Sequence, residues 1–65
     1  MDWIDFLKVM AVEEHAAMAR YNWAAQNTEN PKLRAVFEKL RDEEEFHAEF
    51  LDAERVKLEE LLETE

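Results

Sequence analysis

The chain has no glycine and a single proline, Pro31, among its 65 residues. Glycine and proline most often interrupt helices, so strong helix-breaking signals are absent from the chain except at this one place. Residues 2 to about 27 are also rich in Ala, Leu, Met, Glu and Lys, which favour helix. The sequence therefore predicts an all-α protein with one helix over about 2–27, a turn at 28–30, and a second helix over about 31–63.

Short polar side chains stand where both helices are expected to begin. Asp2 can cap the first helix, with Asp5 three residues later as in a capping box. Asn30 can cap the second helix because Pro31 suits the first helical position, where no N–H is needed. The short connection between the two helices predicts an antiparallel αα-hairpin, and residues 1–65 are expected to form a single domain.

So small a chain buries little surface, and domains of this size usually need disulfides, a metal or a partner chain. The chain has no cysteine, which leaves a metal, self-association or both. Its net charge of -9 argues against nucleic acid and anionic membrane surfaces as partners, and it would attract metal cations. Because we see no basic leader and no apolar run near the ~20 residues of a membrane span, we expect a cytoplasmic protein.

Apolar residues recur along both expected helices at alternating steps of three and four, as in the seams of a left-handed helical bundle. The seam positions are Trp3, Leu7, Met10, Glu14, Ala17, Tyr21 and Ala24, then Leu33, Phe37, Leu40, Glu44, His47, Leu51, Glu54, Leu58 and Leu61. Apart from Tyr21, whose ring is mostly apolar, four of them are polar: Glu14, Glu44, His47 and Glu54. A carboxylate on a seam must be protonated, paired or coordinated, because burial of a bare charge is costly.

The hairpin brings three of these side chains to about the same height along the two helix axes. If the chain reverses near Glu29, residues whose numbers sum to about 58 lie at the same height, so Glu14 faces Glu44. Glu44 and His47 are three residues apart and share one helix face. Carboxylate oxygens with an imidazole nitrogen suit iron, manganese or zinc. Glu14, Glu44 and His47 are therefore predicted to hold one metal ion per chain.

One hairpin supplies only three ligands and leaves an apolar side open. We therefore expect a homodimer, in which two hairpins close a four-helix bundle and the ligands double to four Glu and two His. Further association through the leucine-containing C-terminal ends, near Leu58, Leu61 and Leu62, would give a larger homo-oligomer.

The order Glu14-x6-Tyr21, Asn30-Pro31-x-Leu33, Phe37 and Glu43-Glu44-x-x-His47-Ala48 resembles half of a ferritin-like domain, over about residues 7–54. It is similar to rubrerythrins, bacterioferritins and, as a short self-pairing chain, encapsulated ferritins. The resemblance implies a di-iron site with one iron per chain, or manganese or zinc as substitutes. It also implies that Glu14 and His47 are terminal ligands, that Glu44 is a bridging ligand, and that Tyr21 lies beside the site.

The chain departs from each of these families. Rubrerythrins add a cysteine-rich domain and a further carboxylate where this chain has Ala17. Storage ferritins need more helices per chain, and the targeting tail of an encapsulated ferritin is not evident here. These departures favour ferroxidase-like oxidation of Fe(II) with oxygen or peroxide, with Glu14, Glu44, His47 and Tyr21 as the catalytic residues. A rubrerythrin-like peroxide reductase, a metal-stabilised structural bundle and a metal carrier without catalysis are the alternatives.

The remaining candidate residues are assigned simpler roles. Glu13, Glu43 and Glu45 point off the seam and are expected to be solvated. His15 lies about 100° around the helix from Glu14, so we expect it at the surface or in an interface rather than at the metal. Glu54 lies either at a frayed helix end or at a second cation site.

Overall fold

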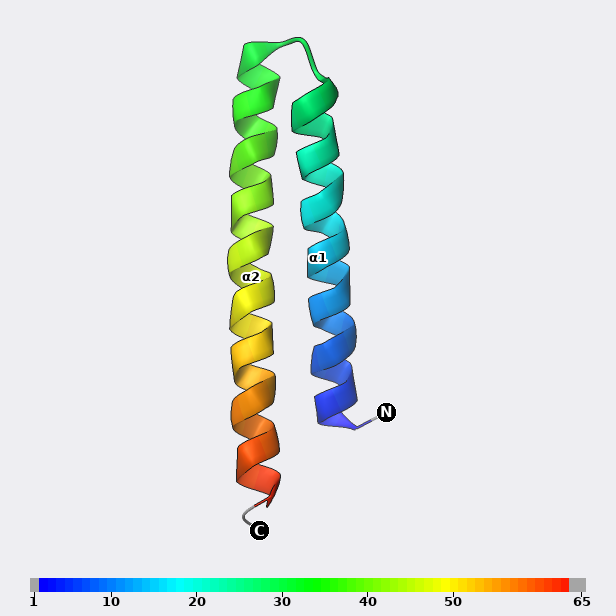
Figure 1. Ribbon diagram of the computed structural model, residues 1–65, viewed down its shortest axis with the longest axis vertical. Coiled ribbons are helices and arrows are strands. Elements are labelled where there is room, and N and C mark those ends of the chain that lie inside the picture. Colours follow the sequence, from blue (N-terminus) through cyan, green and yellow to red (C-terminus); the bar gives the residue numbers. More distant parts are fainter. Residues whose placement is uncertain (1, 64–65) are drawn as a thin grey trace.

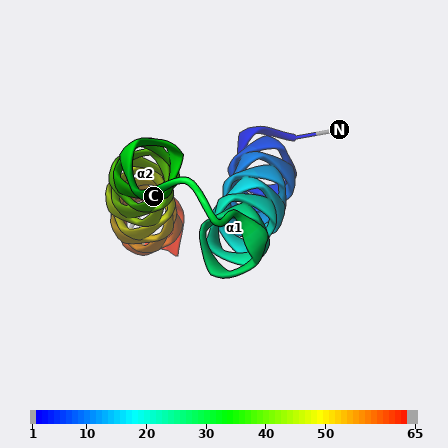
Figure 2. The ribbon, with the colours of Figure 1, turned by 90° about the horizontal axis from the view of Figure 1, so that it is seen from above.

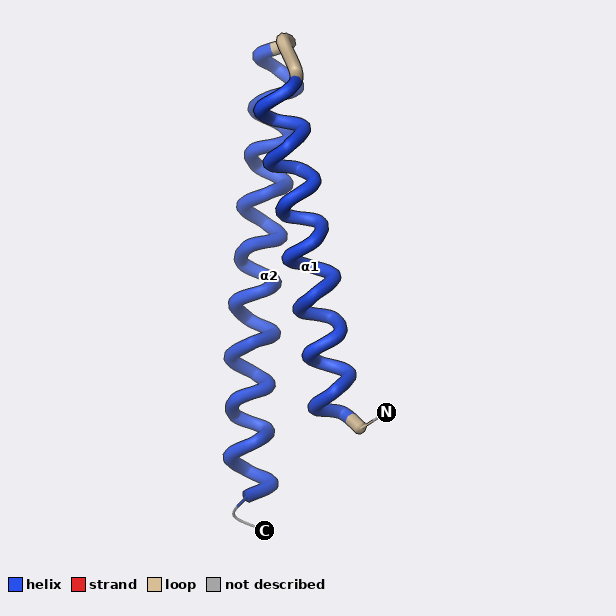
Figure 3. Tube along the Cα trace, turned by 45° about the vertical axis from the view of Figure 1, so that its right-hand side comes forward, coloured by secondary structure: helices blue, strands red, loops and turns tan. Residues whose placement is uncertain are grey.

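The computed structural model describes residues 2–63 and is an antiparallel pair of helices over that range (Figure 1). Helix α1 spans Trp3–Asn27 and helix α2 spans Pro31–Glu63. Figure 2 looks along the helices and shows them side by side with no third element, and Figure 3 shows that loop structure is confined to the turn and the chain start. The all-α class and the two-helix hairpin are confirmed. The pairing of two hairpins into a four-helix bundle stays a prediction.

Both helices begin at the residues expected from the sequence. The carboxylate of Asp2 accepts a hydrogen bond from the Asp5 backbone N–H at 2.8 Å. Asn30 Oδ1 accepts from the backbone N–H groups of Lys32 at 2.9 Å and Leu33 at 3.2 Å. These acceptors satisfy N–H groups that have no partner inside the helix, which is how short polar side chains stabilise a helix start.

The turn is held by contacts that cross from one helix end to the other. The backbone N–H of Thr28 donates to Ala24 O at 3.0 Å and so closes the last turn of α1. Thr28 in turn accepts twice, through Oγ1 from the Asn30 N–H at 3.2 Å and through its carbonyl from Arg34 Nη2 at 2.9 Å. Because Arg34 belongs to α2, this contact fixes the direction in which α2 leaves the turn.

Only alanines are fully enclosed between the two helices. The buried apolar residues of the described chain are Ala11, Ala25 and Ala48. Small side chains let the helix backbones approach closely, but they remove little apolar surface from water. The radius of gyration is 15.2 Å, against about 11 Å for a compact chain of this length. The larger apolar side chains therefore remain available for contact with another surface.

The contact between α1 and α2 divides the surface into two flanks. On the charged flank, Arg41 Nη1 donates to Asn22 Oδ1 at 3.0 Å, and His15 Nε2 lies 3.6 Å from Asp52 Oδ2. The opposite side, here called the open flank, is mainly apolar. It includes Phe6, Met10, Ala17 and Ala24 of α1 with Leu33, Val36, Leu40, His47 and Phe50 of α2.

Within residues 2–63, neither helix combines the length and the apolarity that crossing a lipid bilayer requires.

Candidate metal centre

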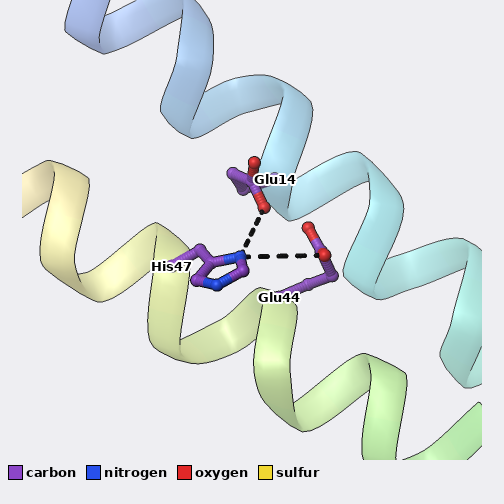
Figure 4. Close-up of side chains that lie close together, drawn as sticks. All are labelled: Glu14, Glu44 and His47. Carbon is purple, nitrogen blue, oxygen red and sulfur yellow. Dashed lines mark ion pairs between the residues drawn. The ribbon is translucent and has the colours of Figure 1, made fainter.

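Glu14 of α1 meets Glu44 and His47 of α2 partway along the hairpin (Figure 4). Each side chain offers one donor atom, and these atoms all lie within 4.8 Å of one another. His47 Nδ1 lies 3.4 Å from Glu14 Oε2 and 3.8 Å from Glu44 Oε1. The three side chains that the hairpin places at one level thus lie together, and their binding of a metal stays a prediction.

The helices position the three side chains in different ways. Glu44 and His47 are one turn apart on α2, so both project from the same side of that helix. Glu14 reaches them from α1 across the helix contact. The two carboxylates are partly enclosed, with 29% of the Glu14 side chain and 21% of the Glu44 side chain exposed, whereas His47 is 54% exposed. The cluster is therefore closed by the hairpin on one side and accessible from the open flank on the other.

The two carboxyl groups are close enough to alter each other's protonation. The pKa of Glu44 is raised above its ordinary value by a hydrogen bond with Glu14, then by burial, and then by the negative charges of Glu14 and Glu43. The charge of His47 acts in the opposite direction and lowers the pKa. The proximity of Glu14 therefore favours the protonated form of Glu44.

One oxygen of the cluster lacks a hydrogen bond. Among residues 2–63, Glu14 Oε2 is buried and has no hydrogen-bond partner. The 3.4 Å approach of His47 Nδ1 is an ion-pair distance without hydrogen-bond geometry. An unpartnered buried carboxylate oxygen is costly, and the native explanation is usually an ion or a water. A cation among the three side chains would satisfy this oxygen and would favour the charged form of Glu44.

The donor set fits a divalent transition metal. Two carboxylate oxygens and one imidazole nitrogen suit iron, manganese and zinc alike, and the set does not select among them. Phe46, Phe50 and Leu51 line a hollow together with Glu14 and His47, so the accessible side of the cluster has an apolar rim. The sequence analysis did not include these three side chains in the site. The sequence did indicate that Phe50 lies near the site, because Phe50 is three residues after His47 and so shares its helix face.

Two other candidates lie apart from the cluster. Tyr21 is two turns along α1 from Glu14 and lines a separate hollow that also contains Phe37. This places Tyr21 at the level of Phe37, as the hairpin numbering predicts, and its role at a metal stays a prediction. His15 pairs with Asp52 on the charged flank, away from the three donors.

The flanking acidic residues are solvated or paired as expected for a surface. Glu13, Glu43 and Glu45 are exposed. Glu54 Oε1 lies 3.4 Å from Lys57 Nζ, so within the described chain this carboxylate has a basic partner one turn further along α2.

Comparisons of the chain with protein-family models, with curated proteins and with solved structures give no match. The geometry of Glu14, Glu44 and His47 is therefore the ground on which a function can be assigned.

Proposed function

We propose that two copies of this chain pair through their open flanks and that Glu14, Glu44 and His47 of both copies hold iron, as in ferritin-like di-iron carboxylate proteins. The pair would promote the oxidation of Fe(II) by oxygen or peroxide. The observation that carries this proposal is the gathering of one ligand atom from each of the three side chains within 4.8 Å, together with a buried Glu14 Oε2 that has no hydrogen-bond partner.

Pairing is supported by what a single hairpin leaves exposed. Phe6, Leu33, Val36 and Phe50 of the open flank are all exposed, and Phe50 also lines the hollow beside Glu14 and His47. Burying them against a second copy would remove apolar surface from water. It would also bring two sets of ligands together, four Glu and two His, which is the set found in di-iron carboxylate bundles. Cations between the copies would offset the repulsion between two chains of net charge -9.

The side chains of the cluster have distinct tasks in this chemistry. Iron, when bound, supplies the one-electron change between Fe(II) and Fe(III). Glu14 and Glu44 provide hard anionic oxygens, which favour the ferric ion and so assist the oxidation of Fe(II). His47 provides a neutral nitrogen donor from the exposed side. Phe46 and Phe50 border the approach to the cluster.

The reaction balances with Fe(II) as the substrate. Two Fe(II) ions each give one electron to dioxygen, which takes up two protons from solvent and leaves as hydrogen peroxide. With peroxide as the oxidant, the same two electrons and two protons yield water. The negative surface of the chain would concentrate Fe(II) around the cluster, and this effect should weaken as salt is added.

The test compares two double variants that remove the same number of charges. Fe(II) is added without oxygen, bound metal is measured, and the ferric absorbance is followed after air is admitted. We expect about one iron per chain in the parent and in the control Glu13→Ala with Glu45→Ala, whose side chains are exposed neighbours of the cluster. The Glu14→Ala with Glu44→Ala variant should oxidise iron only as fast as buffer does.

Equal oxidation rates in the parent and in the Glu14→Ala with Glu44→Ala variant would mean that the iron is oxidised in solution. In that case, Zn²⁺ binding that is lost in His47→Ala would leave a structural or carrier bundle as the function. Zn²⁺ binding unchanged in His47→Ala would show that the cluster is not a metal site.

A further inference from the structure

Helix α1 carries a second apolar stripe on the side that faces away from α2. Val9, Val12, Ala16, Ala19 and Trp23 follow one another at steps of three and four residues, which is the spacing of a coiled-coil seam. At about 100° per residue, they lie roughly opposite Glu14, one of the residues of α1 that contact α2. The side chains are exposed, with Val12 and Trp23 each at 66% and Val9 at 38%. Trp23 also borders the hollow that Tyr21 and Phe37 line, but most of its surface stays exposed. The hairpin itself therefore leaves most of this outer seam uncovered.

The corresponding side of α2 is polar. Its outward positions include Lys39, Asp42, Glu49 and Glu60, with Phe46 as the large apolar exception. Helix α2 has eleven acidic and six basic side chains, whereas α1 has three acidic and two basic ones. Two copies of this acidic chain would repel each other least where α1 meets α1. The charge distribution thus selects α1 as the helix that can accept a second copy on its outer side.

We propose that Val9, Val12, Ala16, Ala19 and Trp23 form a second self-association seam, on which α1 of another copy packs antiparallel. A coiled-coil heptad has two seam positions, a and d. In an antiparallel pair, each a position of one helix faces a d position of the partner helix. Placing Ala16 opposite Ala19 of the second copy also places Val12 opposite Trp23. Small residues then meet at the centre, where the helices approach closely, and the larger residues pack on either side of it.

The charges beside the outer seam agree with this antiparallel register. Glu13 and Arg20 lie on the same edge of the seam, next to Val12 and Ala19 in sequence. In the register that pairs Ala16 with Ala19, Glu13 of one copy lies about 3 Å along the axis from Arg20 of the other. The two-fold symmetry forms this opposite-charge pair twice. In this register Val9 faces Gln26, so the apolar match covers the part of the seam from Val12 to Trp23. This part matches itself in both apolar contact and charge, and so fits a second copy of the same chain.

The outer seam differs from the open flank in its consequence for assembly. Each hairpin would have two self-complementary surfaces on different sides, and the outer seam needs no metal. Pairing at both surfaces links dimers into larger even-numbered assemblies, closed or extended according to the angle between the two axes. This route to a larger homo-oligomer does not involve the C-terminal end of α2.

The first test uses two exposed alanines that occupy matching outward positions, Ala16 of α1 and Ala53 of α2. Mass in solution is measured by light scattering for the parent, Ala16→Glu and Ala53→Glu, without metal, with helix content checked by circular dichroism. The Ala16→Glu variant should have about half the mass of the parent or less, because isologous pairing at the seam is lost. The Ala53→Glu variant should keep the parent mass. Equal masses for the parent and Ala16→Glu, or equal losses in both variants, would overturn the proposal.

A charge exchange tests the register without placing a charge on the seam. Glu13→Arg alone, or Arg20→Glu alone, sets like charges against each other across the two copies and should lower the mass at a given concentration. The variant with both substitutions restores opposite charges and should recover the parent mass. Failure of the double variant to recover, with helix content unchanged, would rule out the pairing of residue 13 with residue 20.

The orientation can be fixed with disulfides because the chain has no cysteine of its own. Mixing Ala16→Cys with Ala19→Cys under mild oxidation should form a disulfide-linked dimer faster than either variant does alone. Only the antiparallel register brings residue 16 of one copy within disulfide reach of residue 19 of the other. Faster linkage within each separate variant than in the mixture would instead show parallel packing and refute the register.

Discussion

The two helices of this hairpin differ in net charge, in the number of cluster side chains they supply and in their apolar surface. Helix α2 is strongly acidic, and it supplies two of the three clustered donors, Glu44 and His47. Helix α1 is nearly neutral, supplies only Glu14, and has apolar side chains on two opposite sides. Charge that gathers cations also repels a second copy of the same chain. Most of that charge lies on α2, so a second copy would be repelled less at the outer side of α1 than at the outer side of α2.

The largest expected effect concerns the cation that we propose is bound between the two helices at the cluster. In the parent, metal at about a hundred times its dissociation constant should raise the free energy of unfolding by about 2.7 kcal/mol. Glu44→Gln keeps the shape of the side chain but removes its charge, so this gain should be absent. Urea unfolding with and without Zn²⁺ measures the difference. A full metal effect in Glu44→Gln would contradict the ligand assignment.

Glu44→Gln also tests how the stability of the metal-free protein depends on pH. The pKa of Glu44 is raised in the folded state above 4.5, its ordinary value. The folded, metal-free protein therefore holds this proton more tightly than the unfolded chain does. The resulting stabilisation is complete below about pH 4.5 and is lost as the pH rises through the raised pKa. Metal-free parent should thus lose stability relative to Glu44→Gln across that window, and no change in their difference would contradict the carboxyl pairing.

The next effect distinguishes the inner side of α2 from its outer side. Ala48 is buried against α1, whereas Ala53 is exposed. Ala48→Leu adds a side chain where no space exists and should lower the free energy of unfolding by about 1–3 kcal/mol. Ala53→Leu should change it by less than about 0.5 kcal/mol. Urea unfolding at one protein concentration compares the two, and equal losses would mean that the helices do not pack at Ala48.

The sequence predicted those parts of the structure that local chemistry controls. The starts of both helices follow from Asp2 and from Asn30 with Pro31, because capping and ring geometry act within one turn. The meeting of Glu14 with Glu44 follows from a short turn between two uninterrupted helices, since helix rise then fixes which residues share a level.

Other features depend on how the helices are rotated about their own axes, which the seam pattern constrains only loosely. The pairing of His15 with Asp52 and of Asn22 with Arg41 defines the charged flank, and the sequence analysis identified neither pair. The outer seam was overlooked for a different reason. Its five residues have the same three-and-four spacing as the inner seam, but the alanines at its centre contribute little apolar signal.

A smaller effect compares how the two helices begin. Asn30 accepts two backbone hydrogen bonds at the start of α2, whereas Asp2 accepts one at the start of α1. Asn30→Ala should lower the free energy of unfolding by about 1 kcal/mol, and Asp2→Ala should lower it by less. Asn30→Ser keeps a capping oxygen and serves as the control. Thermal unfolding followed by circular dichroism ranks the three variants, and a larger loss in Asp2→Ala would show that the start of α1 matters more.

The smallest effect concerns ion pairs within α2, which offset part of its negative charge. Arg55 Nη1 lies 3.1 and 3.2 Å from the two carboxylate oxygens of Glu59, one turn further along the helix. Pairs at this spacing stabilise a helix by about 0.3–0.5 kcal/mol, and salt screens them. Arg55→Gln should therefore lower the free energy of unfolding by about that amount at low salt and by less at high salt, whereas Arg55→Lys should retain most of it. If the loss in Arg55→Gln were the same at both salt concentrations, the contribution of Arg55 would come from packing of its aliphatic stem instead of its charge.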